Sequence, residues 1–150
     1  MEKINWVYKP FSELTAYELY EILSLRNKVF VVEQTCVYDD TDDKDKAAWH
    51  LCGWLNNELI AYTRIIAPGV SYKEASIGRV VTNFSYRKKG IGIELMKLSI
   101  EKTCSQFGVD KITISAQLYL LSFYNSLGFE EIEEPYLEDN IPHIKMIWSK

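Results

Sequence analysis

The stretch between residues 87 and 92 combines positive charge with glycine in a pattern that can bind an anion. Its members are three cations followed by two glycines around an isoleucine: Arg87, Lys88, Lys89, Gly90, Ile91 and Gly92. Glycine lets the backbone come close to a ligand and leaves its amides free to point at that ligand. These residue types therefore predict a site for a ligand that carries phosphate groups.

A strand and a helix must position this stretch, and the hydrophobic pattern predicts both of them. Residues 75–82 read as a strand, and residues 91–107 read as a helix that ends at Gly108. Ile91 and Leu95 begin the apolar stripe of this helix. A helix that starts inside the stretch adds unpaired N–H groups and the positive end of its dipole to the anion site.

The remaining elements follow from the same periodicities and from turn signals. Further strands are predicted at 4–9, 48–55, 59–66, 111–116, 129–134 and 141–148, and further helices at 15–29 and 119–127. Thr15 and Glu18 fit a capping box, and Asn56-Asn57 favours a tight hairpin. Antiparallel hairpins come first and strand–helix–strand units later, and such units imply a parallel pair with a right-handed crossover.

The composition indicates a single globular domain over residues 1–150. Hydrophobic residues make up 47% of the chain and charged residues 25%, as in an ordinary globular protein. The net charge of −4 argues against a nucleic-acid partner. The N-terminus lacks the apolar core of a signal peptide, and no apolar run approaches membrane-spanning length, so no membrane partner is expected. Three cysteines without paired spacing predict reduced thiols and a cytoplasmic location.

Five aspartates gather between residues 39 and 45, and at first sight they suggest a calcium loop. An EF-hand loop needs Gly at its sixth position, and counting from Asp39 that position is Lys44. We therefore predict no metal site here and expect a solvated loop.

Three arginines fall on elements that are otherwise apolar. Arg26 lies on the apolar stripe of the first helix, where a snorkelling side chain is slightly favoured over an inward ion pair. Arg64 and Arg79 lie in apolar strands, so each is expected to pair with a carboxylate. Glu33 and Glu138 are the expected partners.

The anion-binding stretch matches neither of two common nucleotide motifs. It lacks the G-x-x-x-x-G-K-[ST] pattern of a Walker A loop and the third glycine of the dinucleotide-binding fingerprint. It resembles the [RQ]-x-x-G-x-[GA] loop of the GNAT superfamily of acyl-CoA-dependent N-acetyltransferases. A second block, Phe123–Phe129, is similar to that family's F-Y-x-x-x-G-F pattern, and the two blocks stand in the family's order and at its separation.

Further stretches resemble the ElaA-like subfamily and extend the resemblance over nearly the whole chain. They are Leu25-Arg26, Val29–Gln34, Ile77–Val80, Ala116-Gln117 and Glu138–His143. Asn140 departs from the Gly that this subfamily usually carries. Asn tolerates left-handed backbone better than other non-glycine residues, so we expect the turn to be kept.

The resemblance implies an α/β (α+β) fold with a mixed central sheet of about six to seven strands and flanking helices. A splayed strand pair would hold acyl-CoA, with acetyl-CoA as co-substrate and no metal. The pantetheine arm and acetyl oxygen would lie on backbone groups of Val80, Val81 and Thr82, and the pyrophosphate on amides of residues 88–92. The resemblance also counts the side chains of Arg87 and Asn125 among the cofactor-binding residues.

Attack of an amine on a thioester needs a base for the amine and a proton for the leaving thiolate. The resemblance makes Tyr124 the candidate acid, and the alternative is a core aromatic with its hydroxyl at the edge. His143 is a candidate base because imidazole exchanges protons near neutral pH, and Glu33 because it follows an apolar run. Either residue could instead be structural, Glu33 by pairing with an arginine. His50 alternates with apolar residues and is expected to be a packed, hydrogen-bonded core histidine.

The predicted activity is transfer of an acetyl group from acetyl-CoA to a primary amine by direct attack in a ternary complex. The acceptor would be a small-molecule or peptide amine, and the resemblance is compatible with a homodimer. The alternative is a non-catalytic acyl-CoA-binding or regulatory module with the same fold, although the retained Tyr124 favours an enzyme. A phosphate-binding protein unrelated to CoA would leave the block Phe123–Phe129 unexplained.

Overall fold

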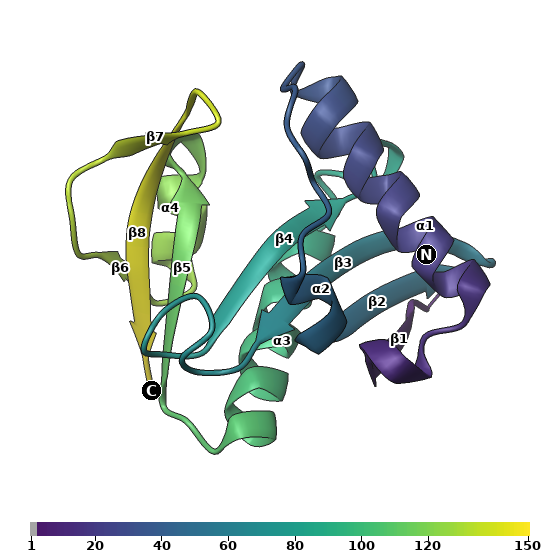
Figure 1. Cartoon of the computed structure of the whole chain (residues 1–150), viewed down its shortest axis with the longest axis horizontal. Coiled ribbons are helices and arrows are strands. Elements are labelled where there is room, and N and C mark those ends of the chain that lie inside the picture. The colour runs from purple at the N-terminus through teal and green to yellow at the C-terminus, as the bar shows by residue number, and fades with distance from the viewer. Residues whose placement is uncertain (1–2) are drawn as a thin grey trace.

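The structure, a computed structural model, describes residues 3–150. In that range eight strands form two antiparallel sheets of four strands each, which lie side by side (Figure 1). The first sheet contains, in spatial order, β1 (Asn5–Pro10), β2 (Trp49–Leu55), β3 (Glu58–Ile66) and β4 (Ser76–Thr82). The second contains β5 (Lys111–Gln117), β8 (Ile141–Ser149) and β6 (Phe129–Glu131), and β7 (Tyr136–Glu138) also pairs with β8.

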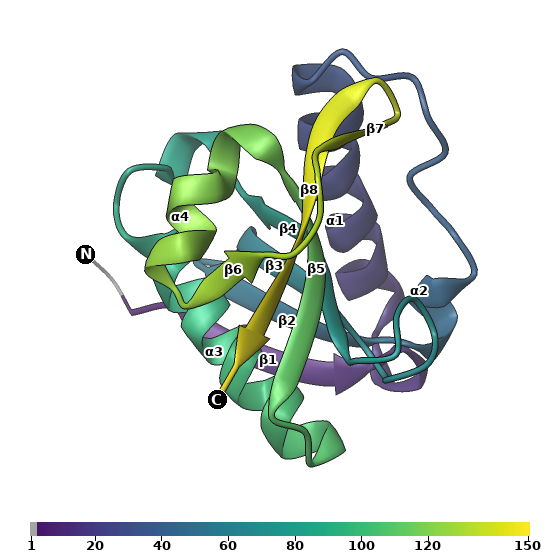
Figure 2. The same cartoon turned by 90° about the vertical axis from the view of Figure 1, so that its left-hand side faces the viewer.

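Helices connect the strands and cover both faces of the first sheet. They are α1 (Ala16–Arg26), a π-helical segment (Asn27–Glu33), α2 (Lys44–Ala47), α3 (Ile91–Phe107) and α4 (Leu121–Ser126). α1 and α3 lie on opposite faces of the first sheet (Figures 1 and 2). Ile22 and Leu25 of α1 pack with Tyr62, whereas Leu95 of α3 packs with Ile65 in a second buried cluster. Within residues 3–150 no helix is long and apolar enough to cross a membrane.

Several local predictions are confirmed at the level of single hydrogen bonds and dihedral angles. Thr15 Oγ1 accepts from the Glu18 amide at 3.1 Å, and the Glu18 carboxylate accepts from the Thr15 amide at 2.8 Å, so the capping box is present. Asn56 and Asn57 adopt φ of 50° and 65° in the hairpin between β2 and β3. Gly108 ends α3 at φ 62°.

Other elements differ from the prediction. The helix predicted at 15–29 is an α-helix only as far as Arg26, and the chain then continues as the π-helical segment. The amides of Gln34 and Cys36 donate to carbonyls five residues earlier, those of Val29 and Val31, at 3.2 and 3.0 Å. The segment contains three valines, at positions 29, 31 and 32, and β-branched residues are slightly less favourable than straight-chain ones in a regular α-helix. The short elements α2 and β7 were not predicted, and β6 is shorter than the strand expected there.

β4 and β5 meet at one end and diverge toward the other (Figure 1). Within residues 3–150 their backbone pairing is limited to an isolated parallel bridge between Ala75 and Ile112, at the start of both strands. β4 also carries a bulge, because Arg79 and Val80 together lie opposite Thr63 of β3, and Arg79 adopts φ 49°. A bulge bends a strand and ends its regular pairing. The splayed strand pair expected from the sequence is therefore confirmed.

Gly128, which follows α4, is expected to tolerate no side chain without loss of stability. Its φ is 98°, and an added Cβ would lie 3.2 Å from Cδ1 of Trp148. We expect Gly128→Ala to lower the free energy of unfolding in urea by about 1 kcal/mol or more. Gly78→Ala is the matched control, since its Cβ would meet nothing within 4 Å. An equal loss in both variants would contradict the argument.

Candidate active site

Two cavities adjoin between the diverging ends of β4 and β5. The larger has a volume of about 440 Å³ and extends along residues 87–92, and the smaller has about 120 Å³ and reaches β7 and β8. Six residues line both cavities and define the junction between them: Phe30, Gln34, Val80, Gln117, Leu120 and Tyr124. A ligand that fills the larger cavity can therefore reach the smaller one only past these side chains.

The stretch of residues 87–92 closes one end of the larger cavity. Lys88 and Gly90 adopt left-handed backbone, with φ of 65° and 77°, and α3 begins directly after them at Ile91. Because Gly90 is the N-cap and carries no side chain, no capping group competes for the first amides of α3. This geometry suits an anion at the helix N-terminus.

Most of the residues predicted to hold the co-substrate line the larger cavity. They are Val80, Val81, Thr82, Arg87, Lys88, Gly90, Ile91 and Gly92. Lys89 does not line it, and its Nζ lies 5.6 Å from the centroid of the Tyr86 ring. Asn125 is exposed and lines neither cavity. The structure thus brings β4 together with residues 87–92, which we name the anion stretch, whereas Lys89 and Asn125 do not line the larger cavity.

Glu33 is tied to the anion stretch and lines neither cavity. Its carboxylate accepts two hydrogen bonds from the Arg87 guanidinium, at 2.6 and 2.9 Å. Arg87 also donates to the Thr82 carbonyl at 3.3 Å, so it connects the π-helical segment to the end of β4. The arginine that Glu33 pairs with is therefore Arg87, and the expected pairing with Arg64 or Arg79 is wrong because those side chains point into the acidic segment described below.

Tyr124 lies at the junction and is 5% exposed. Its ring packs edge-on against Phe123 and Phe129, with centroid separations of 5.1 and 5.8 Å. These contacts explain the aromatic positions of the Phe123–Phe129 block, since α4 and β6 hold the tyrosine from both sides. Burial raises the pKa of the Tyr124 hydroxyl above that of a free tyrosine, so it is protonated at neutral pH. The group can donate a proton to an atom placed at the junction.

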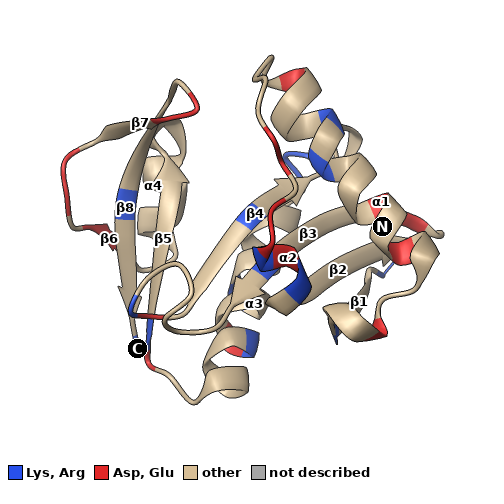
Figure 3. Ribbon diagram, viewed as in Figure 1, with Lys and Arg blue, Asp and Glu red and all other residues tan. Residues whose placement is uncertain are grey.

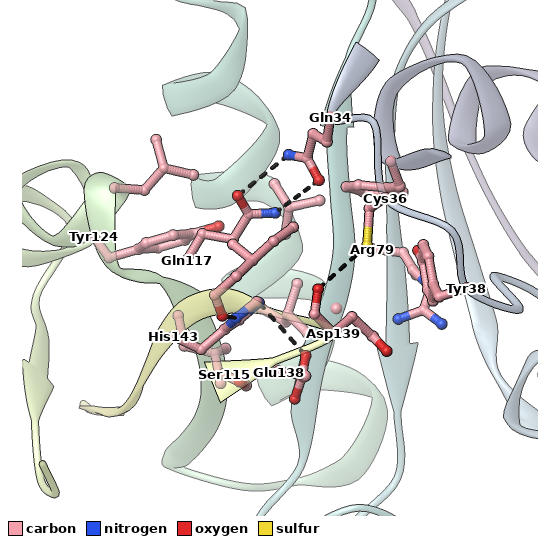
Figure 4. A pocket seen from close by; sticks show the side chains of 17 residues that line it. Gln34, Cys36, Tyr38, Arg79, Ser115, Gln117, Tyr124, Glu138, Asp139 and His143 are labelled. Carbon is pink, nitrogen blue, oxygen red and sulfur yellow. Dashed lines mark hydrogen bonds and ion pairs between the residues drawn. The ribbon is translucent and has the colours of Figure 1, made fainter. Parts of the chain in front are cut away.

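His143 of β8 lines the smaller cavity and is 7% exposed (Figure 4). Its Nδ1 lies 2.7 Å from the carbonyl oxygen of Ile141 and its Nε2 lies 3.5 Å from Glu138 Oε2. A carbonyl can only accept, so Nδ1 carries the proton in the neutral ring and Nε2 holds the lone pair.

The β7–β8 hairpin positions this histidine. Asp139 and Asn140 form its turn with φ of 50° and 62°, so the left-handed turn expected at Asn140 is confirmed. The Tyr136 ring stacks on His143 with a centroid separation of 6.2 Å, and the Tyr136 hydroxyl bonds to Ser115 of β5. Sequence reasoning missed β7. An Asp-Asn pair favours a tight two-residue hairpin turn, and that signal predicts a strand before it.

Arg26 points inward, and the favoured prediction of a snorkelling side chain is wrong. It is fully buried, its Nε lies 2.8 Å from Asp40 Oδ2, and its Nη1 lies 2.8 Å from Asp45 Oδ1. Arg64 Nη1 also contacts Asp45, at 2.9 Å, and Asp42 at 2.6 Å. These carboxylates belong to residues 39–45, which we name the acidic segment. Its red ribbon runs into α2 beside β3 and β4 (Figure 3).

The acidic segment is therefore not simply a solvated loop. Asp40 and Asp45 are buried, and Arg79 Nε lies 2.9 Å from Asp40 Oδ1. The partners of Arg64 and Arg79 are these aspartates, and Glu138 instead faces His143. Burial tends to raise the pKa of Asp45, but hydrogen bonds and charge from Arg26 and then Arg64 outweigh it, so that pKa is lowered. Within residues 3–150 no group of three or more His, Cys, Asp or Glu could hold a metal ion.

The arginine–aspartate network fixes one wall of the smaller cavity. Tyr38, which lines that wall, donates to Asp40 Oδ1 at 2.5 Å, and Arg79 lines the same cavity from the bulge in β4. His50 packs behind the network as the expected core histidine, with Nδ1 2.6 Å from the Tyr62 hydroxyl. Its burial lowers the pKa of the imidazole, which keeps it neutral.

Comparison with known proteins agrees with this architecture. A family model described as an acetyltransferase (GNAT) domain matches residues 26–150. The chain belongs to the GNAT family. The two sheets, the flanking helices and the splayed β4–β5 pair are those of this fold, and the family assigns the chain to the acyltransferases.

Within the GNAT family the chain is similar to ElaA-like proteins. Protein ElaA of Escherichia coli is 42% identical over 146 residues, which cover 95% of each sequence. The crystal structure of E. coli ElaA has a TM-score of 0.92 and covers 98% of this chain and 100% of that one. An acyl-CoA N-acyltransferase from Pseudomonas aeruginosa has a TM-score of 0.93 at 37% identity, with the same coverage. The resemblance seen in the sequence is confirmed.

Proposed function

We propose that this protein transfers an acetyl group from acetyl-CoA to a primary amine by direct attack in a ternary complex. The observation that carries the proposal is the junction, where Tyr124 lies between a cavity that ends at the anion stretch and a cavity that contains His143. A donor bound along the first cavity and an amine in the second would meet beside the tyrosine. The three cysteines of the protein are free thiols, and this supports a location in a reducing compartment such as the cytoplasm.

Each part of the site then has a defined role. The amides of the first turn of α3 bind the pyrophosphate of acetyl-CoA, and backbone groups of Val80, Val81 and Thr82 accommodate the pantetheine arm. His143 Nε2 accepts the proton of the attacking amine, and Glu138 Oε2 lies 3.5 Å from that nitrogen. The Tyr124 hydroxyl donates a proton to the departing thiolate.

The amine acceptor is a small molecule or the exposed amine of a peptide. It enters from a further groove of about 540 Å³, which shares Arg79, Ser115, Glu138 and Asp139 with the smaller cavity. Among the described residues, four carboxylates and three cations line this groove, so both signs of charge are present at the entrance. His143 lies beyond that entrance and removes a proton from the amine.

Release of free thiol from acetyl-CoA, measured with a panel of primary amines, tests the proposal. We expect at least one amine to support turnover, and we expect His143→Gln to lower kcat/KM about a hundredfold, as for loss of a general base. His143→Gln keeps a polar side chain in β8, so calorimetric binding of acetyl-CoA should stay near the wild-type value. Binding of acetyl-CoA without thiol release on any amine would instead favour the non-catalytic acyl-CoA-binding module.

A further inference from the structure

The side-chain amides of Gln34 and Gln117 form a bar across the junction between the two cavities. Gln34 Nε2 donates to Gln117 Oε1 at 3.2 Å, and Gln117 Nε2 donates back to Gln34 Oε1 at 3.3 Å (Figure 4). Gln34 follows the π-helical segment and Gln117 ends β5, so the bar connects the two sides of the cleft. We name it the glutamine bar.

The bar borders the place that the proposed function gives to the acyl group of a bound thioester. Gln117 is the direct cross-strand partner of His143, so the bar borders the proposed base. The other junction residues are apolar except for Tyr124, which is the proposed proton donor. The acyl carbon must come within reach of both groups, and the chain attached to it then extends past the bar into a cavity of about 120 Å³.

Hydrogen-bond chemistry explains why the bar would discriminate by chain length. Each amide uses one N–H and one carbonyl lone pair for its partner and keeps a second of each. A short acyl group leaves this arrangement intact. A longer apolar chain must separate the two partly buried amides, and its apolar surface cannot replace the two hydrogen bonds that are lost, which is unfavourable.

We propose that the glutamine bar sets the length of the acyl group, so that acetyl is accepted and longer chains such as hexanoyl are rejected. This inference rests on the proposed function, because it concerns the donor of that reaction. It assigns a specificity role to two residues that take no part in proton transfer.

Calorimetric binding of acetyl-CoA and hexanoyl-CoA tests the inference without an acceptor. The variants are Gln34→Ala/Gln117→Ala, which removes the bar, and Gln34→Met/Gln117→Met, which keeps its volume but not its hydrogen bonds. We expect the affinity for hexanoyl-CoA relative to acetyl-CoA to rise about tenfold or more in the alanine variant and less in the methionine variant. Gln106→Ala, an exposed glutamine on α3 far from the junction, should leave the ratio unchanged.

Two results would overturn the inference. One is a wild-type protein that binds hexanoyl-CoA as tightly as acetyl-CoA, and the other is a ratio that changes in neither double variant. Failure of the wild-type protein to bind any acyl-CoA would contradict the proposed function itself and the inference with it. Far-UV circular dichroism of each variant identifies folded protein, and the methionine pair supplies the folded comparison if the alanine pair loses structure.

Discussion

The Tyr124→Phe variant is expected to lose a hundredfold or more of kcat while it binds acetyl-CoA with near wild-type affinity. A positioned acid typically contributes about 10²–10⁴-fold to a rate, and this substitution removes only the hydroxyl. The ring keeps its edge-on contacts with Phe123 and Phe129, so the packing of α4 should be unaffected. Steady-state thiol release measures kcat, and calorimetry measures acetyl-CoA binding separately.

A control substitution tests whether removal of a hydroxyl from a tyrosine outside the site also lowers kcat. Tyr20 of α1 is 71% exposed and lies outside both cavities, so Tyr20→Phe should turn over like the wild-type protein. Unchanged turnover in Tyr124→Phe would remove this hydroxyl from the mechanism and leave it a core aromatic. A parallel loss of acetyl-CoA affinity would indicate a binding role in place of proton donation.

The second large effect is expected on stability. Arg26→Met should lower the free energy of unfolding by about 3–5 kcal/mol, because it removes one of the two arginine partners from each of two buried carboxylates, those of Asp40 and Asp45. Methionine fills a similar volume, so the loss reports the missing charge and hydrogen bonds more than a cavity. Urea unfolding followed by tryptophan fluorescence measures the change.

An exposed ion pair serves as the control for this prediction. Lys46 lies 3.6 Å from Asp43 at the surface beside α2, and both side chains are mostly or fully exposed. Lys46→Met should leave the unfolding midpoint in urea unchanged, since surface ion pairs contribute little to the free energy of unfolding. Equal midpoints for Arg26→Met and the wild-type protein would show that the buried network adds no net stability.

The parts of the site that depend on local chemistry were predictable from sequence. The anion stretch and the Phe123–Phe129 block each act through residues that are close together in the chain. A strand, a glycine-bearing turn and a helix start can be recognised without knowledge of the fold. The stretch accordingly lies where a helix begins, at Ile91, and Tyr124 lies at the junction of the two cavities.

The arginine–aspartate network was not predictable in this way. Its partners are separated by 14 to 39 residues, and a run of aspartates in a connecting segment has the same composition whether it is solvated or buried. Arg26 on an apolar stripe allowed two interpretations, and only the approach of Asp40 and Asp45 decides between them. Sequence periodicity carries no information on such long-range pairing.

β7 was missed for a related reason. All three of its residues, Tyr136 to Glu138, are exposed, so it lacks the apolar alternation that marks a half-buried strand. Its existence depends on pairing with β8, which lies across the hairpin turn at Asp139 and Asn140. The contacts of His143 with Tyr136 and Glu138 depend on this pairing and therefore could not be predicted from the sequence.

Within residues 3–150 a single parallel bridge, between Ala75 and Ile112, connects the backbone ladders of the two sheets at one end of the cleft. At the opposite edge the cleft is closed by side-chain contacts, the glutamine bar and the 3.4 Å contact of Cys36 Sγ with the Asp139 carbonyl. None of these side-chain contacts belongs to a strand ladder, so a ligand that displaces them costs neither sheet a ladder hydrogen bond.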